Sequence, residues 1–179
     1  MIELFSIPGL TEDQQLTLLI WAVLGSFILL LILGMTNRVV VFYNGGDFAW
    51  TLFIFLGPVI GGLVGITLVP EGREFADEPA AMISAYVGIG FGALSALVTL
   101  FLSIKRNGLI LGIIVGVFKI ASALLIVLCA FGLLNKIFGR DGAPLATRLT
   151  SMFLFGILMW MTGKLINGDE VTARRQRNA

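Results

Sequence analysis

Histidine is absent from this sequence of 179 residues, and cysteine occurs once, at Cys129. Without histidine there can be no imidazole metal site, no histidine-based catalytic triad and no histidine pH switch. A single cysteine excludes a disulfide within the chain, and its place in an apolar run predicts a small buried hydrophobe. The chain therefore lacks the side chains from which many metal centres and active sites are built.

Charged residues are also few, because they make up 13% of the sequence whereas 58% is hydrophobic. A soluble domain usually carries about a quarter charged residues. So much apolar surface could not be hidden from water in a chain of this size, which indicates a bilayer as the solvent. The formal net charge of +1 also argues against nucleic acid as a partner, because phosphate binding needs a basic face.

Five hydrophobic runs are each long enough to approach the length of a membrane span, about 20 residues. We therefore predict an all-α fold, a polytopic helical membrane bundle with five transmembrane helices in a single domain over residues 1–179. The predicted spans are residues 16–35, 48–69, 82–104, 109–137 and 149–166. Because the last run is short, the alternative is four spans plus an interfacial or re-entrant helix.

Local signals define the starts of two runs. Thr11 and Gln14 have the spacing of a capping box ahead of the first run, and Asp47 is placed to cap the second. Pro58 lies inside the second run and is expected to kink it. The stretch before the first run has no Lys or Arg, so it does not look like a signal peptide, and we expect that run to be retained as a span.

Lysine and arginine gather on one side of a five-span topology. That side receives Arg38, the short loop with Lys105 and Arg106, and the arginines of the tail. Since Lys and Arg favour the cytoplasmic side, we expect an external N-terminus, a cytoplasmic tail at residues 167–179 and a multi-pass protein of a bacterial-type inner membrane.

Small residues recur at intervals of four in the three middle runs. Such spacing places them on one helix face, where they allow close approach of a second helix. This predicts either packing between spans of one chain or grooves that face a neighbouring copy in a homo-oligomer. The helix-packing residues are Gly57, Gly61, Gly65, Gly88, Gly92, Ala96, Gly112 and Gly116.

Lys119 is the one basic residue well inside a predicted span. A lysine at mid-membrane costs about 2.5–3.5 kcal/mol on insertion scales. No acid lies inside any predicted span, so no counterion is apparent. One interpretation is a cavity or pore lining that attracts anions or lipid phosphate; the other is a side chain that extends to the cytoplasmic headgroups.

Two polar segments complete the candidate sites. Arg174, Arg175 and Arg177 in the tail are expected to contact anionic lipid, to anchor the topology or to bind a soluble cytoplasmic protein. The acidic loop at residues 71–81 is interpreted as a solvated connection. No metal site and no cofactor are predicted.

These features favour a non-enzymatic membrane protein that acts as an anchor, scaffold or sensor subunit of a larger, homo-oligomeric complex. In size and architecture alone, the chain resembles small polytopic subunits of bacterial envelope and phage-defence systems. The expected partners are the lipid bilayer, further copies of the chain and a cytoplasmic protein at the tail. The alternative is an oligomeric channel or small transporter with Lys119 facing an anion- or lipid-accessible cavity.

Overall fold

The computed structural model describes residues 11–138 and 144–178. Within these ranges the chain forms six α-helices and one short 3-10 helix, joined by brief connections and without a β-strand. In chain order these are α1 (Glu12–Met35), α2 (Gly45–Thr67), η2 (Phe75–Asp77), α3 (Pro79–Asn107), α4 (Leu109–Phe138), α5 (Leu145–Gly163) and α6 (Gly168–Arg177). The expected external segment before residue 11 lies outside the described residues.

Helices α1 to α5 are all long and apolar enough to cross a membrane, which confirms the predicted all-α polytopic bundle. The fifth run forms a helix of 19 residues, so the five-span prediction is favoured over four spans. Four of the five helices begin three or four residues earlier than the hydrophobic runs do, whereas α4 begins with its run at Leu109. This difference arises because a helix continues into the polar interface, where hydropathy no longer marks it.

The capping prediction at Thr11 is confirmed, and the one at Asp47 is wrong. The Thr11 hydroxyl accepts from the Gln14 N–H at 3.4 Å, and the Gln14 side chain accepts from the Thr11 N–H at 3.0 Å. At α2 the capping group is Asn44, whose side chain accepts from the Asp47 N–H at 3.0 Å. Gly45 and Gly46 are already helical, so Asp47 lies in the first turn with its carboxylate free for other partners.

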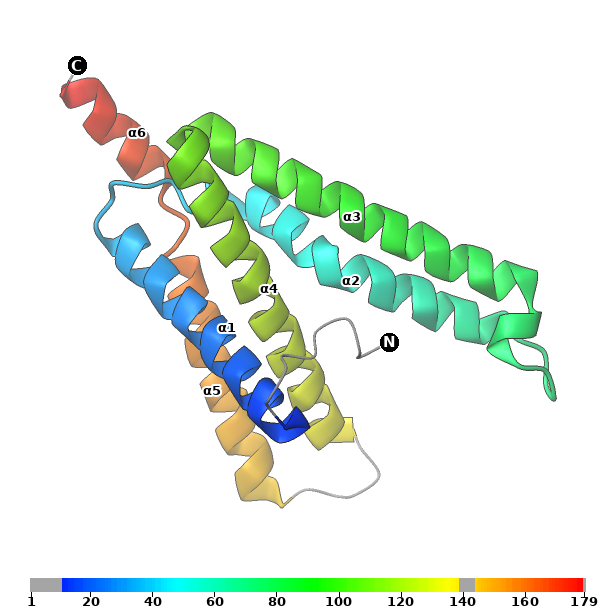
Figure 1. The fold of residues 1–179 in the computed structure, drawn as a ribbon. Helices are drawn as coiled ribbons and strands as arrows, with labels where there is room; N and C mark the ends of the chain where they lie inside the picture. The colour runs from blue at the N-terminus through cyan, green and yellow to red at the C-terminus, as the bar shows by residue number, and fades with distance from the viewer. Residues whose placement is uncertain (1–10, 139–143, 179) are drawn as a thin grey trace.

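Helix α4 is the centre of the molecule, because it packs against α1, α2, α3 and α5. Helices α2 and α3 form a long antiparallel pair (Figure 1). The connections α1–α2, α3–α4 and α5–α6 all lie at the same end, beside α6 (Figure 1). We call this the joined end, and the alternating helix directions are those that five consecutive spans require.

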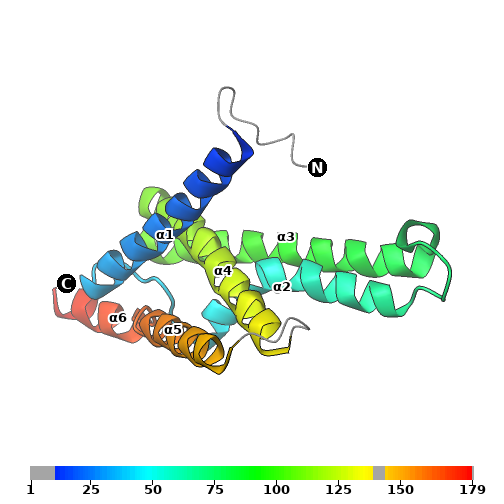
Figure 2. The same ribbon diagram turned by 90° about the horizontal axis from the view of Figure 1, so that it is seen from below.

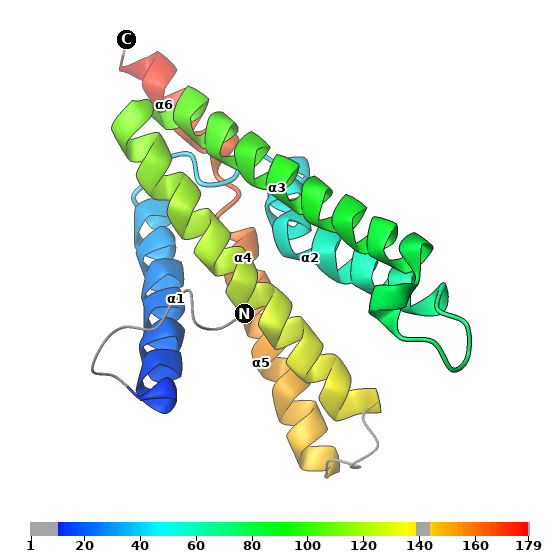
Figure 3. The same ribbon diagram turned by 45° about the vertical axis from the view of Figure 1, so that its right-hand side comes forward.

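The helices spread apart away from the joined end. The α2–α3 pair leaves α4 at an angle and diverges from α1 and α5, both in the view from below (Figure 2) and in the turned view (Figure 3). As a result α5 packs chiefly against α4 alone. Large parts of the apolar helices are therefore left to lipid or to other proteins.

The small residues of the three middle helices pack against one another within the chain. At Gly61 an added Cβ would lie 2.6 Å from the Ser84 carbonyl oxygen and 2.8 Å from the Gly88 Cα. Gly57 and Gly65 meet α3 in the same way, Gly92 meets α2, and Ala96 is half-buried. On α4, Gly112 and Gly116 pack on the end of α3. Of the two interpretations, packing within one chain is the one that these contacts realise.

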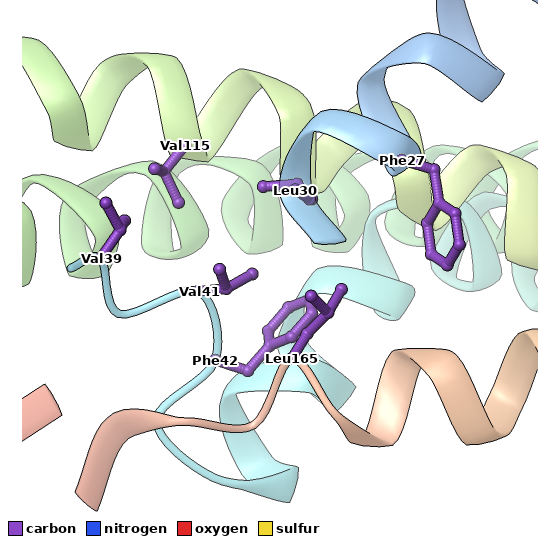
Figure 4. Packing of buried hydrophobic residues seen from close by; sticks show 7 residues of the cluster. All are labelled: Phe27, Leu30, Val39, Val41, Phe42, Val115 and Leu165. Carbon is purple, nitrogen blue, oxygen red and sulfur yellow. The ribbon is translucent and has the colours of Figure 1, made fainter. Parts of the chain in front are cut away.

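The apolar core lies at the joined end. Figure 4 shows its residues gathered from α1, from the segment before α2, from α4 and from the turn after α5. Its members are Phe27, Leu30, Val39, Val41, Phe42, Val115 and Leu165. The core therefore ties the chain together where the connections meet, and not midway along the helices.

Candidate functional site

The segment 39–43, between α1 and α2, is buried up to Phe42 although it is not helical. Its residues from Val39 to Phe42 are between 1% and 4% exposed. In an apolar environment every backbone N–H and C=O must find a partner, and irregular backbone is tolerated only where protein supplies those partners. The groups that surround this segment therefore define the first part of the candidate site.

Two asparagine side chains, which we call the amide clasp, supply most of these partners. Asn107 at the end of α3 accepts from the Val40 N–H and donates to the Val40 carbonyl, both at 2.8 Å. Asn167 accepts from the Val41 N–H at 3.1 Å and donates to the carbonyls of Val39 and Gly34 at 2.9 and 3.2 Å. The clasp thereby fixes the α1–α2 connection to α3 and to the turn after α5.

Backbone bonds extend the clasp on one side. The Phe42 N–H donates to the Leu165 carbonyl at 3.1 Å, and the Asn167 N–H donates to the Phe42 carbonyl at 3.0 Å. These two bonds form an isolated parallel bridge between the connection and the turn after α5. In the segment 39–43, the N–H groups of residues 40–43 and the carbonyls of Val39, Val40 and Phe42 thus have partners inside the protein.

Asp47, Arg106 and Lys119 form a charged centre next to the clasp, since Arg106 directly precedes Asn107. The Lys119 ammonium lies 3.2 and 3.3 Å from the two Asp47 carboxylate oxygens, and both residues are almost fully buried. Arg106 donates to the same carboxylate from the end of α3. Asp47 also accepts from the Tyr43 N–H at 3.1 Å. One carboxylate thus holds two cations, from α3 and α4, at the start of α2.

The centre contains one more positive than negative charge, and neighbouring side chains compensate the excess. The Lys119 ammonium lies 4.7 Å from the centre of the Phe42 ring, and Arg106 lies 5.0 Å from that of Tyr43. Both contacts are cation–π interactions. The Ser103 hydroxyl lies 3.5 Å from the ammonium. Arg106 is 24% exposed, so it connects the buried pair to the outside.

Buried hydroxyls continue from the charged centre along α3. Ser95, Thr99 and Ser103 recur every four residues on one face and are at most 1% exposed. Ser122 on α4 follows Lys119 by three residues and is 2% exposed. The hydroxyls of Thr99 and Ser122 have no hydrogen-bond partner among the described residues. A polar row therefore extends from the joined end into the apolar part of the bundle.

The structure corrects the expectation that Lys119 has no counterion. Asp47 lies inside α2 and not ahead of a span, and it is the acid that Lys119 meets. At 1% exposed, the lysine is directed at this carboxylate and not at an open cavity of the described chain. The sequence contained a signal, because Asp47 directly precedes the run 48–69, Lys119 follows the start of the run 109–137, and both runs begin on the same side.

The tail forms a helix, α6, which hydropathy did not reveal. Arg174, Arg175 and Arg177 are all exposed on it. The Arg175 side chain donates to the Arg106 carbonyl at 2.8 Å and so fastens α6 to the end of α3. Gly168, at the start of α6, packs against Tyr43. The three arginines thus stand at the joined end, beside the connection that carries Arg38.

Two other polar features remain apart from this site. In the acidic loop, Arg73 pairs with Glu78 at 3.3 Å on the surface. Within the described residues no three Cys, Asp or Glu side chains gather as metal ligands would. Cys129 is exposed on α4, contrary to the expectation of burial, and the neighbouring Leu128 and Gly132 are exposed as well.

The contacts at the joined end thus connect α2, α3 and α4 with the α1–α2 connection and with the turn between α5 and α6, through one carboxylate, two cations and two amides. The chain matches no family model, no curated protein and no solved structure.

Proposed function

We propose that this protein is a non-enzymatic membrane scaffold, an anchor or sensor subunit that assembles into a larger complex. The observation that carries the proposal is the closure of the charged centre. Asp47 pairs with both Arg106 and Lys119, and the clasp bonds hold the connections around them. Charges that are paired with one another in this way stabilise the arrangement of the helices. A transport site would instead need charged groups that remain available to bind a ligand.

The distribution of charge supports a cytoplasmic position for the joined end. Basic residues outnumber acids there, and the acidic loop at residues 71–78 lies at the opposite end. Under the positive-inside tendency the joined end faces the cytoplasm of a cell that carries the protein in its inner membrane. A cytoplasmic partner would meet the outward face of α6, where Ala173 and Arg177 are exposed.

Self-association within the bilayer is supported by the open arrangement of the helices. Helix α5 packs chiefly on α4 and keeps a row of exposed apolar side chains along one side, including Leu149, Phe153 and Trp160. Large continuous apolar surfaces of this kind bind lipid or further protein. Since the glycine faces of α2, α3 and α4 are occupied within the chain, we assign the contact between copies to α5.

A second candidate function is an oligomeric channel or small transporter. It is favoured by the row of buried hydroxyls and by the unpartnered Thr99 and Ser122. Polar groups inside a membrane bundle often line ion or proton paths. In this function the Lys119–Asp47 ion pair would have to break during transport, and the cavity that Lys119 faces would lie between subunits.

Native mass spectrometry after extraction in mild detergent tests the two functions. We expect a defined homo-oligomer, alone or with a stoichiometric soluble partner. The variant Phe153→Ser should shift the oligomer toward monomer, whereas Phe101→Ser, on an exposed face of α3, should not. A partner-free monomer would overturn the scaffold proposal. If the protein conducts ions in liposomes and Lys119→Met abolishes that flux, the channel function would replace the scaffold proposal.

A further inference from the structure

A pocket of about 440 Å³ opens at the joined end between the C-terminus of α1 and α6. It is lined by Thr36, Asn37, Arg38, Val171, Arg174, Arg175 and Asn178. The residues come from two segments more than 130 positions apart in the chain. The site exists only because α6 is folded against the α1–α2 connection.

One face of α6 builds half of this pocket. Val171, Arg174, Arg175 and Asn178 follow the spacing of residues that share a helix face. Val171 is 1% exposed and anchors the helix, and the Arg175 bond to the Arg106 carbonyl holds its other end. Two arginines are thereby presented toward the end of α1. Arg177 lies on the same helix but does not line the pocket.

The pocket is strongly basic. Three arginines line it, and no Asp or Glu among the described residues does. Among the described residues Arg38 and Arg174 have no ion-pair partner, although both are exposed at the rim. The acids of α6, Asp169 and Glu170, lie in its first turn and are not among the lining residues. A ligand with a compact negative charge would meet unpaired guanidiniums, which favour phosphate oxygens.

The position of the pocket favours the phosphate of a lipid headgroup over a soluble phosphate. Thr36 directly follows the apolar helix α1, whose last residue, Met35, is 79% exposed. Ile32, one turn earlier, is also exposed, at 54%. Guanidiniums therefore stand at the height where an apolar helix surface ends. A lipid headgroup lies at that height in a bilayer, with its acyl chains beside the helix.

We propose that this pocket binds the phosphate of an anionic phospholipid headgroup, through Arg38 on one side and Arg174 and Arg175 on the other. The bound lipid would extend its acyl chains along the exposed face of α1. The site would fasten α6 to the membrane surface and add a specific lipid to the joined end. This inference is separate from the scaffold function and holds for a monomer as well.

Native mass spectrometry of the full chain in a neutral detergent, titrated with phosphatidylglycerol or phosphatidylcholine, tests the site. We expect tight binding of one phosphatidylglycerol and much weaker binding of phosphatidylcholine. Arg38→Gln and Arg174→Gln should each weaken the phosphatidylglycerol affinity roughly fivefold, the factor that corresponds to about 1 kcal/mol per basic residue near a lipid surface. Arg177→Gln removes the same charge from the same helix and should change the affinity less than twofold.

Three outcomes would overturn the assignment. Equal binding of the two lipids would remove the requirement for a negative headgroup. An equal effect of Arg177→Gln and Arg174→Gln would show that overall charge, and not the pocket, attracts the lipid. Displacement of the lipid by millimolar inorganic phosphate would identify a site for soluble phosphate. Unchanged thermal unfolding of each variant confirms that the comparison is made between folded proteins.

Discussion

Asp47 has a greater role than either cation that it binds. A buried ion pair contributes little net stability compared with apolar residues of the same shape, but removal of one partner leaves an uncompensated charge. Asp47 is the partner of both Arg106 and Lys119, whereas within the described part of the chain each cation has only Asp47 as its acid. The three residues are therefore unequal in what their loss would do.

Replacement of Asp47 should destabilise the protein more than replacement of Lys119. Asp47→Asn leaves two cations without a counterion, and we expect the free energy of unfolding to fall by about 3–5 kcal/mol. Lys119→Met leaves the pair of Asp47 with Arg106 in place and should lose clearly less. Unfolding of the purified protein by SDS titration, followed by circular dichroism, measures both.

Asp13→Asn is the matched control, because that carboxylate is exposed near the start of α1 and should change the midpoint little. Equal losses for Asp47→Asn and Lys119→Met would contradict the picture of one acid shared by two cations. A double variant, Asp47→Asn with Lys119→Met, should recover part of the loss caused by Asp47→Asn alone.

Asn167 is the residue on which the buried connection depends most. Its side chain makes three hydrogen bonds to the backbone of residues 34–41, and it is 3% exposed. In Asn167→Ala these buried groups lose their partners, at about 1–3 kcal/mol for each one left unsatisfied. Hydrogen exchange of the Val41 amide should accelerate sharply. Gln176→Ala, in exposed α6, should leave that exchange unchanged, and protection of Val41 in Asn167→Ala would refute the role of the clasp.

At the scale of the helices, the close contact of α2 and α3 rests on glycine backbone. An added methyl group at Gly61 would collide with the Ser84 carbonyl and the Gly88 backbone, neither of which can move alone. Gly61→Ala should therefore cost about 1–3 kcal/mol, as overpacking does. Gly62, the next residue, has open space around it, so Gly62→Ala should be neutral or slightly stabilising. Equal thermal unfolding midpoints for the two variants would contradict this packing.

Pro58 shows how α2 and α3 adapt to each other. A proline inside a helix leaves the carbonyl four residues earlier without its donor, here that of Ile54. An added Cβ at Gly92 would lie 2.6 Å from that oxygen and 2.9 Å from the proline ring. The glycine thus lets α3 cover the altered turn closely. The helix itself continues through Pro58 without a break.

Hydropathy was sufficient to predict the five long helices, because a span must be apolar over its whole length. It could not locate α6, whose polar sequence has the composition of a solvated tail and folds only by packing Val171 against the joined end. The roles of Asn107 and Asn167 were equally hidden. A single buried amide has no periodicity, and its partners lie 67 and 126 positions away.

The glycine spacing predicted close helix contacts but could not identify the partner. Either a neighbouring copy or a second span of the same chain satisfies the pattern. The contacts of Gly57 with Gly88 and of Gly116 with Leu100 lie within one chain. The expectation that Lys119 has no counterion was wrong for a similar reason. Hydropathy alone started the second span at residue 48, and this placed Asp47 outside the membrane.

For the whole molecule, the two ends differ in charge. The joined end carries Arg38, Lys105, Arg106, Lys164, Arg174, Arg175 and Arg177, with Lys119 directed toward it, against the acids Asp47, Asp169 and Glu170. Among the described residues, the opposite end carries Asp13 and the acids of the acidic loop, Glu71, Glu74, Asp77 and Glu78, against the bases Arg73, Lys136 and Arg148. This asymmetry predicts a single orientation in the membrane.

Cysteine labelling tests the orientation. In a Cys129→Ser background, Ala76→Cys and Ala173→Cys place one exposed thiol at each end without changing the charge. A membrane-impermeant maleimide should label Ala76→Cys in intact cells. It should reach Ala173→Cys only after permeabilisation. The reverse pattern would place the joined end outside, and labelling of both in intact cells would contradict the five-span arrangement.

The amide clasp also sets an order of events during synthesis. Lys119 is made 72 residues after Asp47, and Asn167 follows Val41 by 126 residues. Until α3 and α4 have been made, the Asp47 carboxylate lacks both of its cations. At the membrane surface water can hydrate it during this time. The segment 39–43 gains its last partners only when α5 has been inserted. A nascent chain that stops before Asn167 would therefore leave the Val41 N–H and the Val39 carbonyl without these hydrogen bonds, so the buried connection can close only after α5 has been made.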